Sequence, residues 1–155
     1  VYLRFGRLAV EDINAPDYQF EMGKGVQLAD GSDVTLVATG LMVAEAIKAK
    51  DLLAAEGISA RVINIHTIKP IDEDIIAKAA KETGAIVTAE EHSVYGGLGS
   101  AVAEVVTKTC PVPVQMVGTT EFGASGKPAV LLEAYGLTAA NIAEKAKKVM
   151  AQKRA

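Results

Sequence analysis

The length and composition of the chain describe one globular domain of ordinary size. Its 155 residues are 50% hydrophobic and 23% charged, enough for a single core. A net charge of -3 gives no basic excess for nucleic-acid binding, and no apolar run reaches the roughly 18 to 20 residues of a membrane helix. One cysteine and two histidines exclude an internal disulfide and a cysteine-rich zinc site, so we expect a soluble protein in a reducing, cytoplasmic compartment.

The first residues read as the end of another domain. Residues 1–7 are rich in β-branched and aromatic types and follow no turn, so they predict the last strand of a domain whose body precedes residue 1. Residues 8–30 are interpreted as a linker interrupted by Pro16, followed by a short extended arm and an Asp-Gly turn. The domain proper is expected over residues 31–155.

From residue 31 onward, predicted strands alternate with predicted helices. Continuous apolar runs indicate strands at residues 34–39, 60–65, 85–89 and 112–117. Apolar residues at helical spacing predict helices between residues 40 and 57, from an N-cap at Asp72 to Gly84, after Gly97, over 128–134, and from an N-cap at Thr138 onward. The expected fold is therefore α/β, with three layers: an open, mostly parallel five-stranded sheet with helices on both faces.

The segment after the third of these strands holds the densest group of polar residues. Ligands of open α/β sheets bind at the carboxyl ends of strands. The candidate site residues there are Glu90, Glu91, His92, Gly97, Gly99 and Ser100. The acids and the imidazole could do general acid and base work, and the glycine amides at the helix start could hold an anion. Alternatively, the glycines permit close strand–helix packing while the acids cap backbone amides or face a partner subunit.

Other candidate motifs fail on their spacing. Gly96 and Gly99 lack the first part of the dinucleotide fingerprint, and residues 123–128 place a proline where a Walker loop needs a hydroxyl. His66 has no partner at metal-ligand spacing and is interpreted as a hydrogen-bonded loop histidine. Cys110 has no activating base nearby in the sequence and is interpreted as a plain thiol. We assign no metal ligand and no catalytic residue.

Several of these segments together resemble one family, the C-terminal portion of thiamine diphosphate-dependent transketolases, and specifically the C-terminal subunit of transketolases split into two chains. The most specific matches are residues 90–100 and 122–126, and the resemblance extends over residues 1–7, 31–40, 69–72 and 135–138. Deoxyxylulose-phosphate synthases and the β subunits of 2-oxo acid dehydrogenases carry similar domains, with less similarity near residues 122–138.

The resemblance implies a non-cofactor-binding third domain that serves packing and dimer assembly. It implies a parent enzyme that moves a two-carbon ketol unit between sugar phosphates in the pentose phosphate pathway, with thiamine diphosphate and magnesium held by its other two domains. The implied partners are the N-terminal transketolase subunit or domains and further copies in a homo-oligomer. Arg7 matches the family arginine that contacts the substrate's phosphate, a role that suits bidentate pairing by a guanidinium. Without the other domains the chain is expected to be inactive.

Two alternatives stay open. The chain could be the equivalent domain of a 2-oxo acid dehydrogenase β subunit or of a deoxyxylulose-phosphate synthase. It could also be a stand-alone regulatory module that binds an anion at the helix start near residues 96–100.

Overall fold

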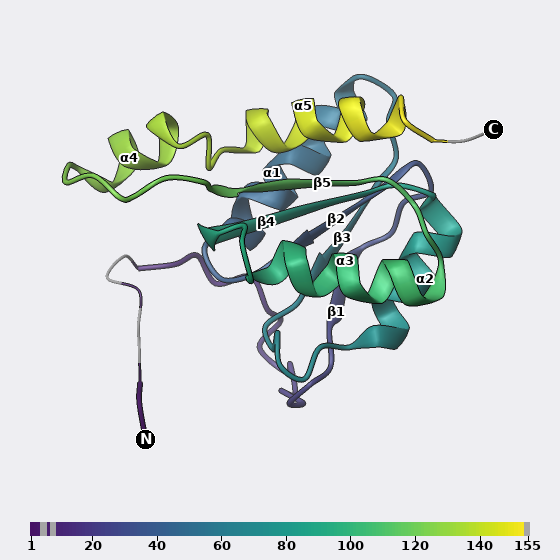
Figure 1. Cartoon of the computed structure of the whole chain (residues 1–155), viewed down its shortest axis with the longest axis horizontal. Helices are drawn as coiled ribbons and strands as arrows, with labels where there is room; N and C mark the ends of the chain where they lie inside the picture. The colour runs from purple at the N-terminus through teal and green to yellow at the C-terminus, as the bar shows by residue number, and fades with distance from the viewer. Residues whose placement is uncertain (4–5, 7–8, 154–155) are drawn as a thin grey trace.

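The computed structural model describes residues 1–3, 6 and 9–153, and within them helices and strands alternate along most of the chain (Figure 1). The elements in chain order are β1 (Val26–Ala29), β2 (Val34–Ala38), α1 (Met42–Ala55), β3 (Ala60–Asn64), α2 (Glu73–Thr83), β4 (Ile86–Ser93), α3 (Leu98–Thr109), β5 (Val114–Thr119), α4 (Pro128–Ala134) and α5 (Ala139–Met150). The alternation inferred from the apolar runs is thus present from β2 onward.

The strands form one five-stranded sheet in the order β1-β3-β2-β4-β5. Strands β2 to β5 are parallel to their neighbours, whereas β1 pairs with β3 in the antiparallel direction. The mostly parallel sheet predicted from the sequence is confirmed. Its first strand lies within the segment interpreted as an extended arm, so that segment is built into the edge of the sheet.

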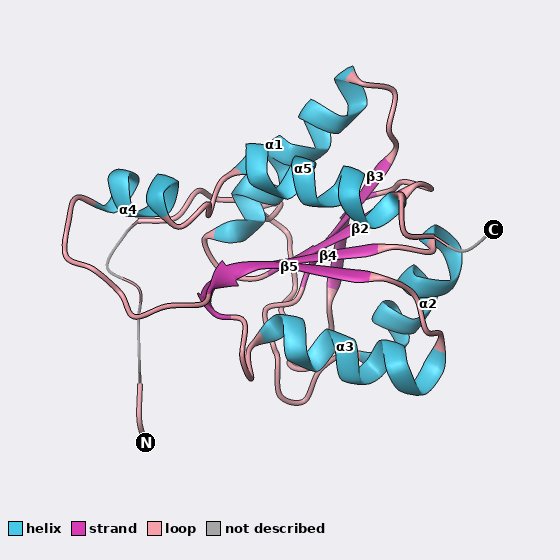
Figure 2. Ribbon diagram, turned by 45° about the horizontal axis from the view of Figure 1, so that its top comes forward, coloured by secondary structure: helices cyan, strands magenta, loops and turns pink. Residues whose placement is uncertain are grey.

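Helices cover both faces of the sheet, with α1 and α5 on one side and α2 and α3 on the other (Figure 2). All five residues of β2 are buried, because a central strand is covered on both faces. Leu36 packs into the α1–α5 core and its neighbour Val37 into the α2–α3 core, following the two-residue alternation of a strand. Helix α4 lies outside these layers, and none of its residues is buried.

The helix ends follow the local signals in the sequence. The Asp72 carboxylate accepts a hydrogen bond from the Ile75 amide at 3.3 Å, and α2 ends at Gly84 with a φ of 68°. The Thr138 hydroxyl accepts one from the Asn141 amide at 3.3 Å and caps α5. Both predicted caps are confirmed.

Asp72 also joins two distant parts of the chain, since its second carboxylate oxygen accepts from the Gly25 amide at 3.0 Å, just before β1. We expect Asp72→Ala to lower the free energy of unfolding by about 1–2 kcal/mol, because a helix cap and a partly buried amide both lose their acceptor. Urea denaturation followed by circular dichroism measures the change. Asp72→Asn keeps an acceptor for the cap and should lose clearly less; equal losses for the two variants would contradict the capping role.

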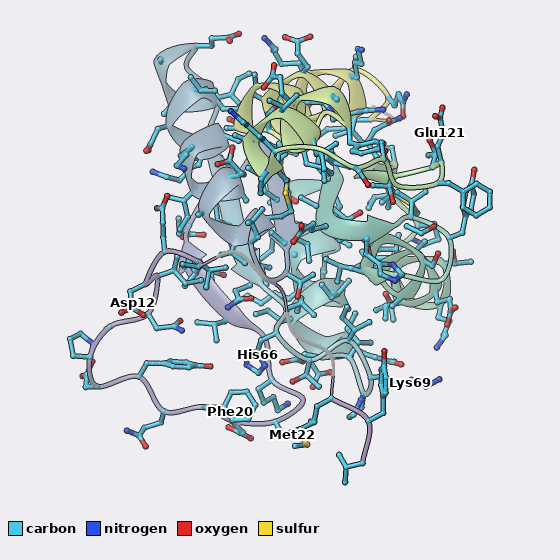
Figure 3. All side chains as sticks on the ribbon, turned by 90° about the vertical axis from the view of Figure 1, so that its left-hand side faces the viewer. Asp12, Phe20, Met22, His66, Lys69 and Glu121 are labelled. Atoms are coloured by element: carbon cyan, nitrogen blue, oxygen red, sulfur yellow. The ribbon has the colours of Figure 1, made fainter. Side chains whose placement is uncertain are left out.

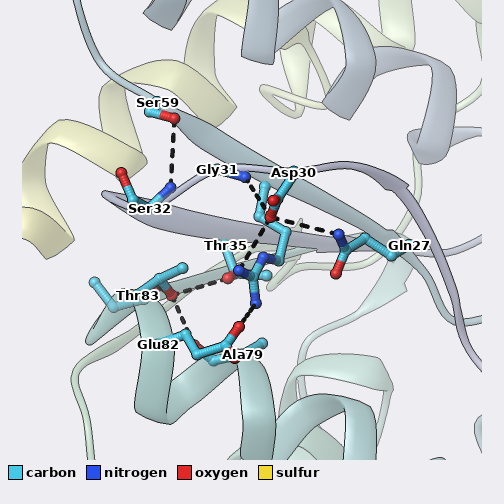
Figure 4. Close-up of polar contacts among 11 residues, drawn as sticks. Gln27, Asp30, Gly31, Ser32, Thr35, Ser59, Ala79, Glu82 and Thr83 are labelled. Carbon is cyan, nitrogen blue, oxygen red and sulfur yellow. Dashed lines mark hydrogen bonds and ion pairs between the residues drawn. The ribbon is translucent and has the colours of Figure 1, made fainter.

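A polar network ties together the amino ends of the strands (Figure 4). The buried Arg61 guanidinium donates to Glu82 at 2.6 Å and to Asp30 at 3.1 Å, linking β3 to α2 and to the turn after β1. Beside it, the buried hydroxyls of Thr35 and Thr83 lie 2.8 Å apart. These groups lie at the edge opposite the carboxyl ends of the parallel strands, and their contacts hold the fold together.

Candidate functional site

The topology of the sheet places one crevice at the carboxyl ends of its central strands. Strands β2 and β4 are neighbours, yet β2 leads into α1 on one face while β4 leads into α3 on the other. Doubly wound sheets bind ligands at such a reversal. The candidate residues after β4 stand at this edge, whereas Arg7 lies outside the described residues.

Strand β4 continues further than the sequence predicts. It was expected to end at residue 89, but it runs to Ser93, which pairs with Thr119 of β5 after a shift in register. Glu90, Glu91 and His92 are therefore strand residues and not the start of a loop. Glu90 is buried, with 1% of its surface exposed, while Glu91 and His92 are exposed.

The buried carboxylate of Glu90 caps helix α3. It accepts hydrogen bonds from the Leu98 amide at 2.7 Å and from the Gly99 amide at 2.8 Å, one on each oxygen. These amides belong to the first turn of α3, whose own N-cap residue is Gly97 and offers no side chain. A negative charge at a helix N-terminus is stabilised by the free amides and by the helix dipole. Of the alternatives for the acids of this segment, backbone capping describes Glu90.

Glycines make room for this carboxylate. A Cβ atom on Gly97 would lie 2.0 Å from a Glu90 oxygen, and one on Gly99 would lie 2.7 Å from the Met116 sulfur and 2.8 Å from the Thr88 hydroxyl. A Cβ on Gly118 of β5 would come within 2.8 Å of the His92 carbonyl oxygen. Gly97, Gly99 and Gly118 are therefore explained by close packing. The sequence analysis did not single out Gly118, because it ended the expected strand at residue 117, whereas β5 runs to Thr119.

The remaining polar residues of the segment shape its turn. The Ser100 hydroxyl donates to the Val94 carbonyl and accepts from the Gly96 amide, both at 2.9 Å, and so closes the turn before α3. His92 is half exposed, and its Nδ1 lies 2.9 Å from the Ser93 carbonyl oxygen but 4.0 Å from the Glu90 carboxylate. Glu90 and His92 thus do not form the hydrogen-bonded pair that general acid–base catalysis uses.

The same contacts bear on anion binding. The amides of Leu98 and Gly99, the groups that an external anion would use, already have the Glu90 carboxylate as their partner. A second anion would also meet the charge of that carboxylate at close range. The geometry therefore weighs against a regulatory anion site at the start of α3.

A second cavity lies beside β3, where the linker (residues 9–22) crosses the carboxyl edge. Its volume is about 340 Å³, and residues 9–14, Asn64, His66 and Leu132 are among those that line it. The His66 ring packs against Phe20 of the linker, with the ring centroids 4.6 Å apart and the planes tilted by 43° (Figure 3), and its Nδ1 lies 2.8 Å from the Thr67 hydroxyl. The interpretation of His66 as a hydrogen-bonded loop histidine is confirmed, and its ring fixes the linker to the sheet.

An ion pair holds the same linker to α1. Lys48 donates to Glu11 at 3.1 Å and to Glu45 at 3.0 Å, and its hydrogen bond to Glu45 is the main cause that raises the pKa of the Lys48 ammonium group above its usual value. Glu45 also accepts from the Ala139 amide at 2.8 Å, so α1 caps the start of α5 as β4 caps α3. The linker thus follows a defined path along the domain.

Within residues 1–3, 6 and 9–153, no three or more acidic, histidine or cysteine side chains gather as metal ligands. No helix in the described part of the chain is long and apolar enough to cross a membrane.

Fold and site together define a doubly wound α/β domain in which the helix end at the expected ligand crevice is closed by the protein's own glutamate. The sequence model of the family described as the C-terminal domain of transketolase matches residues 23–142. The chain belongs to this transketolase C-terminal domain family.

Known relatives and solved structures agree with this assignment. The chain is 47% identical over 154 residues to a 6-deoxy-6-sulfo-D-fructose transketolase subunit from Clostridium sp. (strain MSTE9), covering 99% of this chain and 48% of that protein. It is 47% identical over 130 residues to a 1-deoxy-D-xylulose-5-phosphate synthase from Heliobacterium modesticaldum, covering 83% of this chain and 20% of that protein. A split-gene transketolase solved as an inactive beta4 tetramer has a TM-score of 0.93 and 48% identity, covering 96% of this chain and 49% of that one. The chain therefore spans about half the length of its transketolase-subunit relatives.

Proposed function

We propose that this chain is the last domain of a transketolase that transfers a two-carbon ketol unit between sugar phosphates. The observation that carries the proposal is the 47% identity to a transketolase subunit along nearly the whole chain. In such an enzyme the thiamine cofactor supplies the carbanion-stabilising chemistry. This domain contributes no catalytic group in our proposal, because its most buried acid, Glu90, is committed to two backbone amides.

The proposed role of the domain is assembly. It would pack against the N-terminal transketolase domains or subunit that hold thiamine diphosphate and magnesium, and it would contribute to a homo-oligomer in the cytoplasm. Two features support this role: the carboxylates of Glu90 and Glu45 bond to backbone amides within the chain, and relatives of about twice this length include a transketolase subunit. Of the candidate residues, the exposed Glu91 and His92 are then proposed as contacts to a partner subunit.

Two measurements test the proposal. Calorimetric titration of the 155-residue chain with thiamine diphosphate and magnesium should show no saturable heat, because in this proposal the N-terminal domains or subunit hold the cofactor. The full enzyme containing this chain should transfer two carbons from a ketose phosphate to an aldose phosphate. Saturable cofactor binding by the isolated chain would contradict the non-cofactor-binding role.

A second candidate function is the corresponding domain of a 1-deoxy-D-xylulose-5-phosphate synthase. The 47% identity to such an enzyme over 130 residues favours it, although the match covers less of this chain than the transketolase-subunit match. The substrates used by the full enzyme separate the two. Formation of deoxyxylulose phosphate without two-carbon transfer between sugar phosphates would support this second function and remove the first.

Arg7 gives a test of substrate binding in the full enzyme. We expect Arg7→Ala to raise the KM for phosphorylated sugars about tenfold or more, because a charge-assisted pair with the substrate phosphate is lost. Steady-state kinetics with phosphorylated substrates measures the effect. Arg4→Ala is the control, since it removes the other arginine of residues 1–7, and it should change the KM less; an unchanged KM in Arg7→Ala would remove Arg7 from the site.

A further inference from the structure

An apolar projection extends from the carboxyl edge of the sheet. It consists of residues 120–134, the loop after β5 followed by α4, and we refer to it as the α4 arm (Figure 1). Phe122 is fully exposed and Val130 is 61% exposed, although both are large apolar side chains. No residue of α4 is buried, although five of its seven residues are alanine, valine or leucine, the other two being Pro128 and Glu133. Apolar groups gathered on a projection mark an interaction surface.

The α4 arm is held in shape by its own contacts. The Tyr135 hydroxyl accepts a hydrogen bond from the Ala124 amide at 2.7 Å and donates to the Phe122 carbonyl at 3.2 Å, so it pins the loop to the end of α4. Leu132 and Tyr135 pack against the α1–α5 core and anchor the base of the arm. The exposed side chains therefore sit on a preformed support, which lowers the entropy cost of docking.

A pocket beneath the α4 arm could accommodate side chains of a partner protein. Its volume is about 480 Å³, and it lies between the arm and the ends of β4 and β5. Apolar residues of the arm and of its base line one side, and polar strand residues line the other: Leu131, Leu132, Leu137, His92, Ser93 and Thr119. An apolar centre beside polar groups is the usual composition of a protein–protein interface.

The direction of β1 shows which part of the chain lies near the α4 arm. Because β1 is antiparallel to β3, Val26 stands opposite Asn64, and the chain reaches β1 from the carboxyl edge of the sheet. The linker then follows α1, held by Glu11, and residues 9–14 line a cavity that Leu132 of α4 also lines. Residues 9–14 therefore lie next to the base of the α4 arm.

We propose that the α4 arm docks onto the transketolase section that precedes this domain in its longer relatives, with Phe122 at the centre of the contact. This inference rests on the proposed function, since it requires that preceding section. A tether of this length sets an effective concentration on the order of millimolar, which favours the attached section over a second copy at micromolar concentration. The high effective concentration of the preceding section, together with the exposed apolar area of the α4 arm, favours this section as the binding partner.

Photo-crosslinking in the full chain tests the docking. The variant Phe122→p-benzoylphenylalanine should, on irradiation, crosslink to peptides of the preceding section, identified by mass spectrometry. Leu52→p-benzoylphenylalanine is the matched control, because Leu52 is an exposed apolar residue on α1 away from the arm. Crosslinks between copies of this domain, or no crosslink above the control, would overturn the proposal.

A second variant tests the docking at a position where the substitution should not disturb folding. A separate activity measurement distinguishes the docking proposal from the proposed function. Since Phe122 is fully exposed, Phe122→Ser should leave the unfolding midpoint of the 155-residue chain unchanged, while in the full chain it should increase the rate of proteolysis within residues 9–22 about tenfold. An unchanged proteolysis rate in the full chain would overturn the docking. Two-carbon transfer by the unmodified full enzyme is measured independently: activity without crosslinking removes only the docking, and crosslinking without activity removes only the proposed function.

Discussion

Replacing Glu90 by alanine is expected to lower the free energy of unfolding by about 3–5 kcal/mol, because two buried amides lose their acceptor and a cavity forms. Both amides lie in the first turn of α3, so the loss falls on a helix that covers one face of the sheet. Urea denaturation of the 155-residue chain, followed by circular dichroism, measures the difference.

Two further variants separate the cap from general effects of charge removal. Glu91→Ala removes the same kind of side chain from the next, exposed position and should change stability by less than about 0.5 kcal/mol. Glu90→Gln keeps one acceptor oxygen and should cost about 1–3 kcal/mol. Equal effects at Glu90 and Glu91 would show that the carboxylate–amide contacts do not support the fold.

Gly31→Ala is expected to destabilise the domain by about 3 kcal/mol, the upper end of overpacking costs. A Cβ atom at this position would lie 2.3 Å from the Ala60 carbonyl carbon and 2.4 Å from the Arg61 nitrogen. Both atoms belong to the backbone of β3 and cannot rotate away, so the turn after β1 must move. Because Asp30 and Arg61 meet beside this turn, the shift would also strain their ion pair. Calorimetry should record a melting temperature lower by about 6–12 °C.

Gly123→Ala provides the matched control for this substitution. A Cβ on Gly123 would meet no atom within 4 Å, and its φ lies outside the left-handed region. The melting temperature should stay within about 2 °C of the parent, since an alanine in open space adds no clash. A comparable drop in both variants would mean that the close approach at Gly31 does not limit the fold.

Features that depend on neighbours in the sequence could be predicted from it. The central strands β2 and β3 could be predicted from their mostly apolar sequences, because both of their faces are covered and all of their residues are buried. The caps at Asp72 and Thr138 act on amides three residues away, so their signal is local. The family resemblance was likewise carried by contiguous segments, and the family assignment confirms it.

Features that depend on distant residues could not be predicted in the same way. The Glu-Glu-His sequence reads as a loop, yet it continues β4 because Ser93 pairs with Thr119 and the Glu90 carboxylate finds amides on α3. The arm before residue 31 contains a sheet strand only because β3, more than thirty residues later, offers it an edge. The candidate acid of the sequence analysis therefore turned out to be a buried helix cap, which no local pattern distinguishes from a catalytic group.

The antiparallel edge strand also determines how the domain responds to mechanical force. A pull on the linker is transmitted to β1, whose hydrogen bonds to β3 run perpendicular to the strand. Tension along the strand loads these bonds in shear, so they share the force and must break together, whereas a peeling force would break them one at a time. The hydrogen bond from the Gly25 amide to Asp72 lies just before β1, at the end where the linker pulls, so it is the first of these bonds to be loaded. Motions of a section attached to the linker would thus be transmitted through β1 to the rest of the sheet without separating this edge strand.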